Sequence, residues 1–114
     1  PQNKLSVGLI NKTFIKKMKK PFWLINTARG SAVKIKDLID GIQNKKIFGA
    51  ALDVLEYEKK SFEDTFDIKI HQDFADLIKN EKIILTPHIA GWTHESHIKL
   101  AKIIVQKIQK DFPV

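Results

Sequence analysis

Three short, mostly apolar runs that each end in polar residues limit most strongly how this 114-residue chain can fold. The runs are Phe22–Ile25, Ala50–Val54 and Lys82–Leu85. Their lengths suit β-strands, and an unbroken apolar run such as Phe22–Ile25 is typical of a strand buried inside a sheet. The chain therefore predicts three strands, each leading into a polar loop.

The segments between these strands have helical periodicity. Ile35, Leu38, Ile39 and Ile42 stand at i, i+3, i+4 and i+7, which predicts an amphipathic helix. A loop over residues 59–70 and a short helix around residues 74–78 precede the third strand, and a long helix begins at about Thr93. Alternating strands and helices predict an α/β fold, in which about four helices flank a parallel sheet of about three strands.

The net charge of +7 is concentrated at one end of the chain, because residues 1–20 contain six lysines and no acid. Lysines at positions 16, 17, 19 and 20 could bind nucleic acid through phosphate contacts. However, Phe14, Ile15 and Met18 follow the N-cap residue Asn11 at helical spacing, so we interpret the lysines as the solvated face of a short helix. A basic binding module acting on nucleic acid or an acidic partner stays open as the alternative.

Composition excludes several other classes. The chain has no Cys, which rules out disulfide scaffolds and thiolate metal sites and fits a cytoplasmic protein. It has no apolar run near the ~20 residues that a membrane span needs, so we expect no membrane partner. His94 and His97 stand at i, i+3 but lack a third ligand at suitable spacing, so we predict no metal site.

Polar residues of interest follow each predicted strand. Arg29 follows the first strand, Asp53 and Glu58 lie at the end of the second, and His88 follows the third. Ligands of parallel α/β sheets bind outside the carboxyl ends of the strands. Each of these residues alone is more often a surface ion pair, a helix cap or a solvated side chain. Together they could bind an anion and exchange a proton with a polarised oxygen.

Three ordered motifs give the chain a family resemblance. The motifs are NTARG at Asn26–Gly30, GAALDVLEYE at Gly49–Glu58 and TPHIAG at Thr86–Gly91, after an opening GLIN at Gly8–Asn11. In this order they resemble the C-terminal signatures of the D-isomer-specific 2-hydroxyacid dehydrogenases. The likeness extends over nearly the whole chain.

The resemblance implies roles for individual residues. Arg29 would clamp the carboxylate of a 2-hydroxy or 2-oxo acid. Glu58 would pair with His88, which would donate a proton during reduction and accept one during oxidation. Asp53 would contact the nicotinamide end of NAD, with NADP left open. The residues implied in cofactor binding are Thr27, Ala28, Arg29, Asp53, His88, Ile89, Ala90 and Gly91.

The chain also departs from the family pattern. It has no glycine-rich G-x-G-x-x-G turn and no substrate-binding domain. The resemblance therefore implies that residues 1–114 are the C-terminal portion of an NAD-binding domain, half of a Rossmann-like unit and inactive in isolation. The parent would be a homodimer. A separate hypothesis is that isolated chains associate, because an exposed parallel edge strand is prone to pair. The 29 residues between Glu58 and His88 are nearer to lactate-type than to phosphoglycerate-oxidising members, and the substrate stays open.

Overall fold

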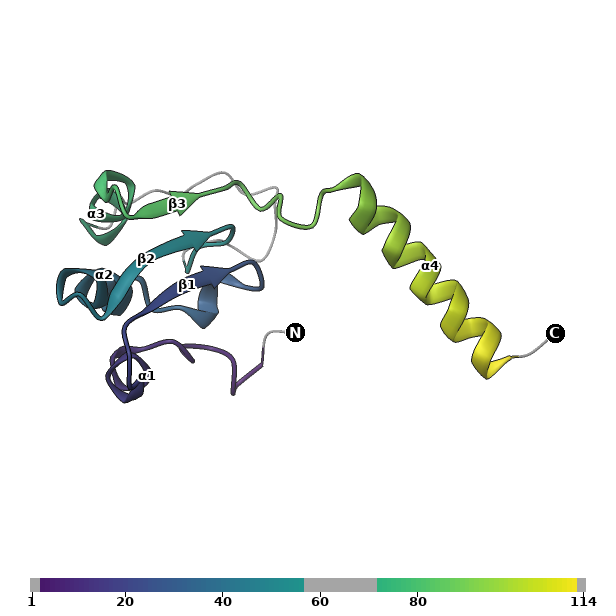
Figure 1. Ribbon diagram of the computed structural model, residues 1–114, viewed down its shortest axis with the longest axis horizontal. Helices are drawn as coiled ribbons and strands as arrows, with labels where there is room; N and C mark the ends of the chain where they lie inside the picture. Colours follow the sequence, from purple (N-terminus) through teal and green to yellow (C-terminus); the bar gives the residue numbers. More distant parts are fainter. Residues whose placement is uncertain (1–2, 57–71, 113–114) are drawn as a thin grey trace.

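The computed structural model describes residues 3–56 and 72–112 and is built on a parallel sheet of three strands (Figure 1). The strands, in their order across the sheet, are β1 (Phe22–Asn26), β2 (Ile47–Leu52) and β3 (Ile83–Leu85). The helices are α1 (Lys12–Lys17), α2 (Ile35–Gln43), α3 (Gln72–Lys79) and α4 (His94–Asp111), with a 3₁₀ turn at Gly30–Ala32. The predicted α/β fold is confirmed. The predicted loop over 59–70 lies outside the described residues.

Helix α1 carries the lysine run, and its first turn is capped as predicted. The Asn11 side chain accepts a hydrogen bond from the Phe14 amide at 3.0 Å. Ile15 is buried, whereas the lysines at 16, 17, 19 and 20 are exposed. The helix ends at Lys17, so Met18 lies in extended backbone beyond the helix, unlike the prediction. The lysines are therefore solvated.

Helix α2 provides most of the apolar core. Its four predicted apolar positions, Ile35, Leu38, Ile39 and Ile42, are all buried. No side chain of its own caps its first turn, but Glu56 from beyond β2 does so by accepting a hydrogen bond from the Ile35 amide at 3.0 Å. Glu56 also pairs with Lys34. The helix is thus fastened to the chain segment that follows β2.

In the part of the chain that the structure describes, only one face of the sheet is covered, which corrects the prediction that the first strand is buried. Trp23 and Ile25 are 70% and 73% exposed, while Asn26 is buried. Phe48 on β2 and Ile84 on β3 are also exposed. Helix α2 packs on β2 between α1 and α3. Because side chains alternate between the two faces of a strand, those that point away from α2 are left exposed. The opposite face has no cover among the described residues.

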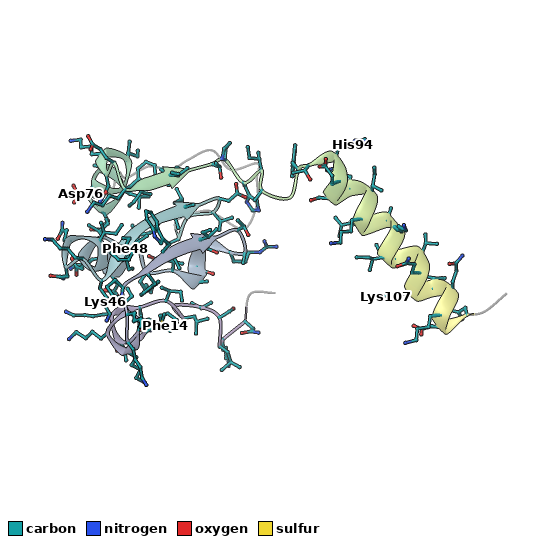
Figure 2. The ribbon with its side chains drawn as sticks, viewed as in Figure 1. Phe14, Lys46, Phe48, Asp76, His94 and Lys107 are labelled. Carbon is teal, nitrogen blue, oxygen red and sulfur yellow. The ribbon has the colours of Figure 1, made fainter. Side chains whose placement is uncertain are left out.

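Helix α4 extends away from the α/β body (Figure 1). The Thr93 side chain caps it by accepting a hydrogen bond from the Ser96 amide at 3.1 Å, as expected for a helix that begins here. None of its residues is buried, and the predicted apolar stripe, which includes Ile98 and Val105, lies exposed. Figure 2 shows His94 at the start of this helix, nearer the body, and Lys107 further out along it.

Within the described part of the chain, every helix is too short or too polar to cross a membrane.

Candidate functional site

The carboxyl ends of the three strands lie level with one another at one edge of the sheet. Asn26 at the end of β1 is in register with Leu52 at the end of β2, and Leu52 is in register with Leu85 at the end of β3. The turns that follow the strands therefore start side by side. For the turns that carry Arg29, Asp53 and His88, this register agrees with the expectation that polar residues after the strands gather at one edge.

Arg29 lies on the turn after β1, and the buried Asn26 side chain holds that turn. Asn26 Oδ1 accepts a hydrogen bond from the Ala28 amide at 3.1 Å, and Asn26 Nδ2 donates to the Arg29 carbonyl at 3.0 Å. The Arg29 side chain is exposed, and its Nη1 donates to the Ala28 carbonyl at 2.7 Å. The turn thus presents a guanidinium group at the open edge of the sheet.

Gly30 allows this turn to press against the backbone beyond β2. A Cβ atom built on Gly30 would lie 1.7 Å from the carbonyl oxygen of Leu55. No side chain fits at that distance, so the close approach requires glycine. The Arg29 turn is thereby packed against the segment that carries Asp53 and Glu56.

Asp53 follows β2 directly and is almost fully buried, with 4% of its surface exposed. Its Oδ1 accepts hydrogen bonds from the Thr86 hydroxyl and from the Ile89 amide at 2.9 Å, and its Oδ2 accepts one from the Ala90 amide at 2.9 Å. Burial acts to raise the pKa of Asp53. The hydrogen bonds, first that of Thr86, together with the charge of nearby His88, outweigh burial and hold the pKa below its ordinary value.

His88 lies on the turn that Asp53 holds, and its backbone is left-handed. Its φ is 58°, which is uncommon for a residue with a side chain. The His88 amide donates to the Thr86 carbonyl at 3.0 Å, closing a tight turn around Pro87. The next two amides, of Ile89 and Ala90, are those that Asp53 binds. Hydrogen bonds on both sides therefore hold this conformation in place.

The remaining predicted site residues have simpler placements. Thr27 and Ala28 lie exposed on the first turn, and Ile89, Ala90 and Gly91 lie exposed on the third. The structure brings Asp53 and the His88 turn into contact. Glu58, the predicted partner of His88, lies outside the described residues. In residues 3–56 and 72–112, no group of three or more His, Asp or Glu side chains could hold a metal ion.

The sequence reasoning assigned no role to Asn26 or Thr86, although both bond to the turns of the site. A signal existed for Asn26, because an asparagine immediately before a turn often bonds the amide two residues ahead. Thr86 offered no comparable signal, since its partner lies 33 residues away.

Comparisons with known proteins show which family the chain resembles. Residues 1–90 match the family model of the D-isomer specific 2-hydroxyacid dehydrogenase, NAD binding domain. A D-lactate dehydrogenase of Staphylococcus aureus is 38% identical over 98 residues, which are 84% of this chain and 30% of the relative. An aromatic 2-oxoacid reductase of Clostridium sporogenes is 35% identical over 104 residues, which are 90% of this chain and 31% of the relative.

A solved structure of the same family is also similar to this chain. The D-isomer specific 2-hydroxyacid dehydrogenase of Lactobacillus delbrueckii ssp. bulgaricus, in its NAD complexed form, has a TM-score of 0.71 and 32% identity. The match covers 99% of this chain and 35% of that one. The chain thus spans about a third of the length of the relatives that it matches.

The parallel sheet and the polar turns at its carboxyl edge define an α/β unit of the Rossmann-like, dinucleotide-binding class. The family match covers most of the residues that build this unit. The chain belongs to the D-isomer specific 2-hydroxyacid dehydrogenase family, as part of its NAD binding domain. The alternative of a basic binding module is not favoured by these relatives.

Proposed function

We propose that this chain forms the catalytic side of the NAD-binding domain of an enzyme that interconverts D-2-hydroxy acids and 2-oxo acids. The observation that carries the proposal is the placement of Arg29, Asp53 and His88 on turns that begin level with one another at one sheet edge. We place the enzyme in the cytoplasm, as a homodimer.

Arg29 would bind the substrate carboxylate. A guanidinium group has five N–H donors in a planar fork that matches a carboxylate, and Arg29 is exposed on a turn that is itself held rigidly. Its side chain could therefore fix the orientation of a 2-oxo acid, so that the carbonyl lies near His88. Such orientation lowers the activation barrier, because the entropy cost of bringing the reacting groups together is met when the substrate binds.

His88 would act as the acid and base. In reduction it would donate a proton to the carbonyl oxygen of the 2-oxo acid, and in oxidation it would take the proton of the hydroxyl group. Glu58 would pair with His88 and favour its protonated form. When bound, NADH would supply the hydride that adds to the carbonyl carbon. The products of reduction are then the 2-hydroxy acid and NAD.

The chain fits the nicotinamide end of NAD and not the whole cofactor. Thr27, Ala28 and the segment from His88 to Gly91 would line that end, and a Cβ atom at Gly91 would meet no atom within 4 Å, so the segment is open to a ligand. Asp53 would also contact the nicotinamide end of the cofactor. The glycine-rich turn that holds the pyrophosphate has no counterpart in these 114 residues. We therefore propose that the isolated chain has no dehydrogenase activity.

A chimera tests the proposal. In the chimera, this chain would replace the matching 30% of the Staphylococcus aureus D-lactate dehydrogenase. The rest of that enzyme would supply the parts that this chain does not contain. We expect the chimera to oxidise NADH in the presence of one or more 2-oxo acids. We expect the chain alone to show no such activity and no binding of NADH at micromolar concentration. A chimera that folds and binds NADH but reduces no 2-oxo acid would refute the proposed function.

A further inference from the structure

Asn26 and Asp53 are the two buried polar side chains of the described part of the chain, and they lie at the ends of neighbouring strands. Only 6% of Asn26 is exposed. A buried amide is costly unless its donor and acceptor atoms are both used, so its hydrogen-bond partners show what holds it there. Asn26 is not suited to a direct role in the reaction, because an amide neither binds a carboxylate strongly nor transfers protons.

The Asn26 side chain spans the turn that carries Arg29. Its oxygen accepts from the Ala28 amide at 3.1 Å, and its nitrogen donates to the Arg29 carbonyl at 3.0 Å. The two bonds fix the backbone on both sides of the peptide that joins Ala28 to Arg29. An aspartate could accept but not donate, and an alanine could do neither. The position therefore requires an amide.

The backbone of Asn26 also connects the two turns of the site. Its carbonyl oxygen accepts a hydrogen bond from the Asp53 amide at 3.0 Å. The Asp53 carboxylate in turn holds the amides of Ile89 and Ala90, directly after His88. A continuous path of hydrogen bonds thus runs from the Arg29 carbonyl to the His88 turn.

We infer that Asn26 is a positioning residue, which holds the Arg29 turn in the conformation that presents the guanidinium group to the substrate carboxylate. This inference rests on the proposed function. Asn26 acts through the backbone of Arg29 and touches neither substrate nor cofactor. Its loss should weaken binding of the 2-oxo acid more than binding of NADH, because Arg29 binds the substrate, and it should leave the acid–base group unchanged.

The first experiment measures amide hydrogen exchange in the full 114-residue chain. Asn26→Ala should make the Ala28 amide exchange roughly tenfold faster, since the hydrogen bond that protects it is gone. The control is Asn44→Ala, which removes a comparable side-chain bond, from Asn44 Nδ2 to the Asp40 carbonyl, at the exposed end of α2. The control should leave Ala28 unchanged. Unaltered exchange of Ala28 in Asn26→Ala would overturn the inference.

The second experiment measures steady-state kinetics in the chimera. Asn26→Ala should raise the KM for the 2-oxo acid about tenfold or more, and by more than the KM for NADH, with the pH dependence of kcat as in the unmodified chimera. Asn26→Asp keeps the acceptor for Ala28 but sets a second acceptor against the Arg29 carbonyl, so it should also raise the same KM. Asn44→Ala should behave as the unmodified chimera.

The outcomes separate the two proposals. If Ala28 exchanges faster but the KM for the 2-oxo acid is unchanged in both Asn26 variants, Asn26 is only structural and the inference is wrong. A uniform loss of NADH binding and turnover would likewise contradict it. If the unmodified chimera folds and binds NADH but reduces no 2-oxo acid, the proposed function fails, and the inference fails with it whatever the exchange data show.

Discussion

The carboxylate of Asp53, buried at the end of β2, accepts a hydrogen bond from the amide of Ala90 at 2.9 Å, across to the turn that follows β3. With the bonds from Thr86 and Ile89, this contact ties the His88 turn to the neighbouring strand. The turn is therefore part of the sheet edge and not an independent loop. Its geometry should respond to the ionisation of a single carboxyl group.

The first prediction concerns pH. Because the folded chain holds the pKa of Asp53 below its ordinary value of 3.8, ionised Asp53 stabilises the fold at pH values above 3.8, and this contribution is lost as the pH falls through the lowered value. Asp53→Asn should lower the free energy of unfolding at pH 7, because its amide group turns a donor toward the Ile89 or Ala90 amide. The measurement is urea denaturation from pH 2 to pH 7. The difference between wild type and Asp53→Asn should shrink toward the acid end, and a constant difference would contradict the assignment.

The second prediction concerns the close approach at Gly30. Gly30→Ala places a Cβ atom 1.7 Å from the Leu55 carbonyl oxygen, so the backbone must move. We expect the free energy of unfolding to fall by about 3 kcal/mol, at the upper end of the usual range for overpacking. Gly91→Ala is the matched control, since its Cβ would meet nothing within 4 Å. Equal stability of the two variants in urea denaturation would show that the Gly30 contact is unimportant.

The third prediction separates function from stability at His88. Its φ of 58° disfavours most side chains, but asparagine adopts this region readily. His88→Asn should therefore leave the free energy of unfolding within about 0.5 kcal/mol of wild type. In the chimera it should reduce kcat about 10²–10⁴-fold, because the side chain at position 88 can no longer donate or accept the proton. His88→Val, which is branched at Cβ, should destabilise the chain in the same denaturation assay. Wild-type turnover in His88→Asn would exclude His88 as the proton donor.

The fourth prediction concerns self-association of the isolated chain. β1 and β3 are the two edges of the sheet, and Trp23, Ile25 and Ile84 expose a large apolar surface on its uncovered face. Such edges and faces favour pairing with another chain. We expect concentration-dependent dimers or larger species in analytical ultracentrifugation, and we expect Trp23→Lys and Ile84→Lys to favour the monomer. A chain that sediments as a monomer at all concentrations would disprove association.

Local patterns predicted most of the secondary structure. The apolar stripe of α2 and the Asn11 cap of α1 were predictable, because helix periodicity and capping depend on residues within one or two turns. The extent of α1 was less predictable, since nothing local showed that the helix would end at Lys17, before Met18. The site edge was predictable for a different reason: parallel neighbouring strands bring their carboxyl ends together whatever their side chains are.

The burial of each strand could not be read from its composition. The apolar run from Phe22 to Ile25 is consistent with cover on both faces, but the described helices cover one, which leaves Trp23 and Ile25 exposed. The stripe on α4 shows the same limit, because an amphipathic pattern indicates that a helix can pack and does not indicate against what. Whether a strand face or a helix stripe is buried depends on which other helices and strands of the folded chain pack against it.

The alternation of strands and helices and the motifs at the strand ends, and hence the family, depend on residue types at short spacing, so they could be predicted before folding was considered. The groups that hold the site could be identified only in the folded chain. The partners of Asp53 lie 33 to 37 residues further along the chain, and they meet its carboxylate only because β2 and β3 pair in one register. The burial of Asn26 is likewise imposed by the packed sheet, whereas its bond to the Ala28 amide, two residues ahead, follows a local pattern.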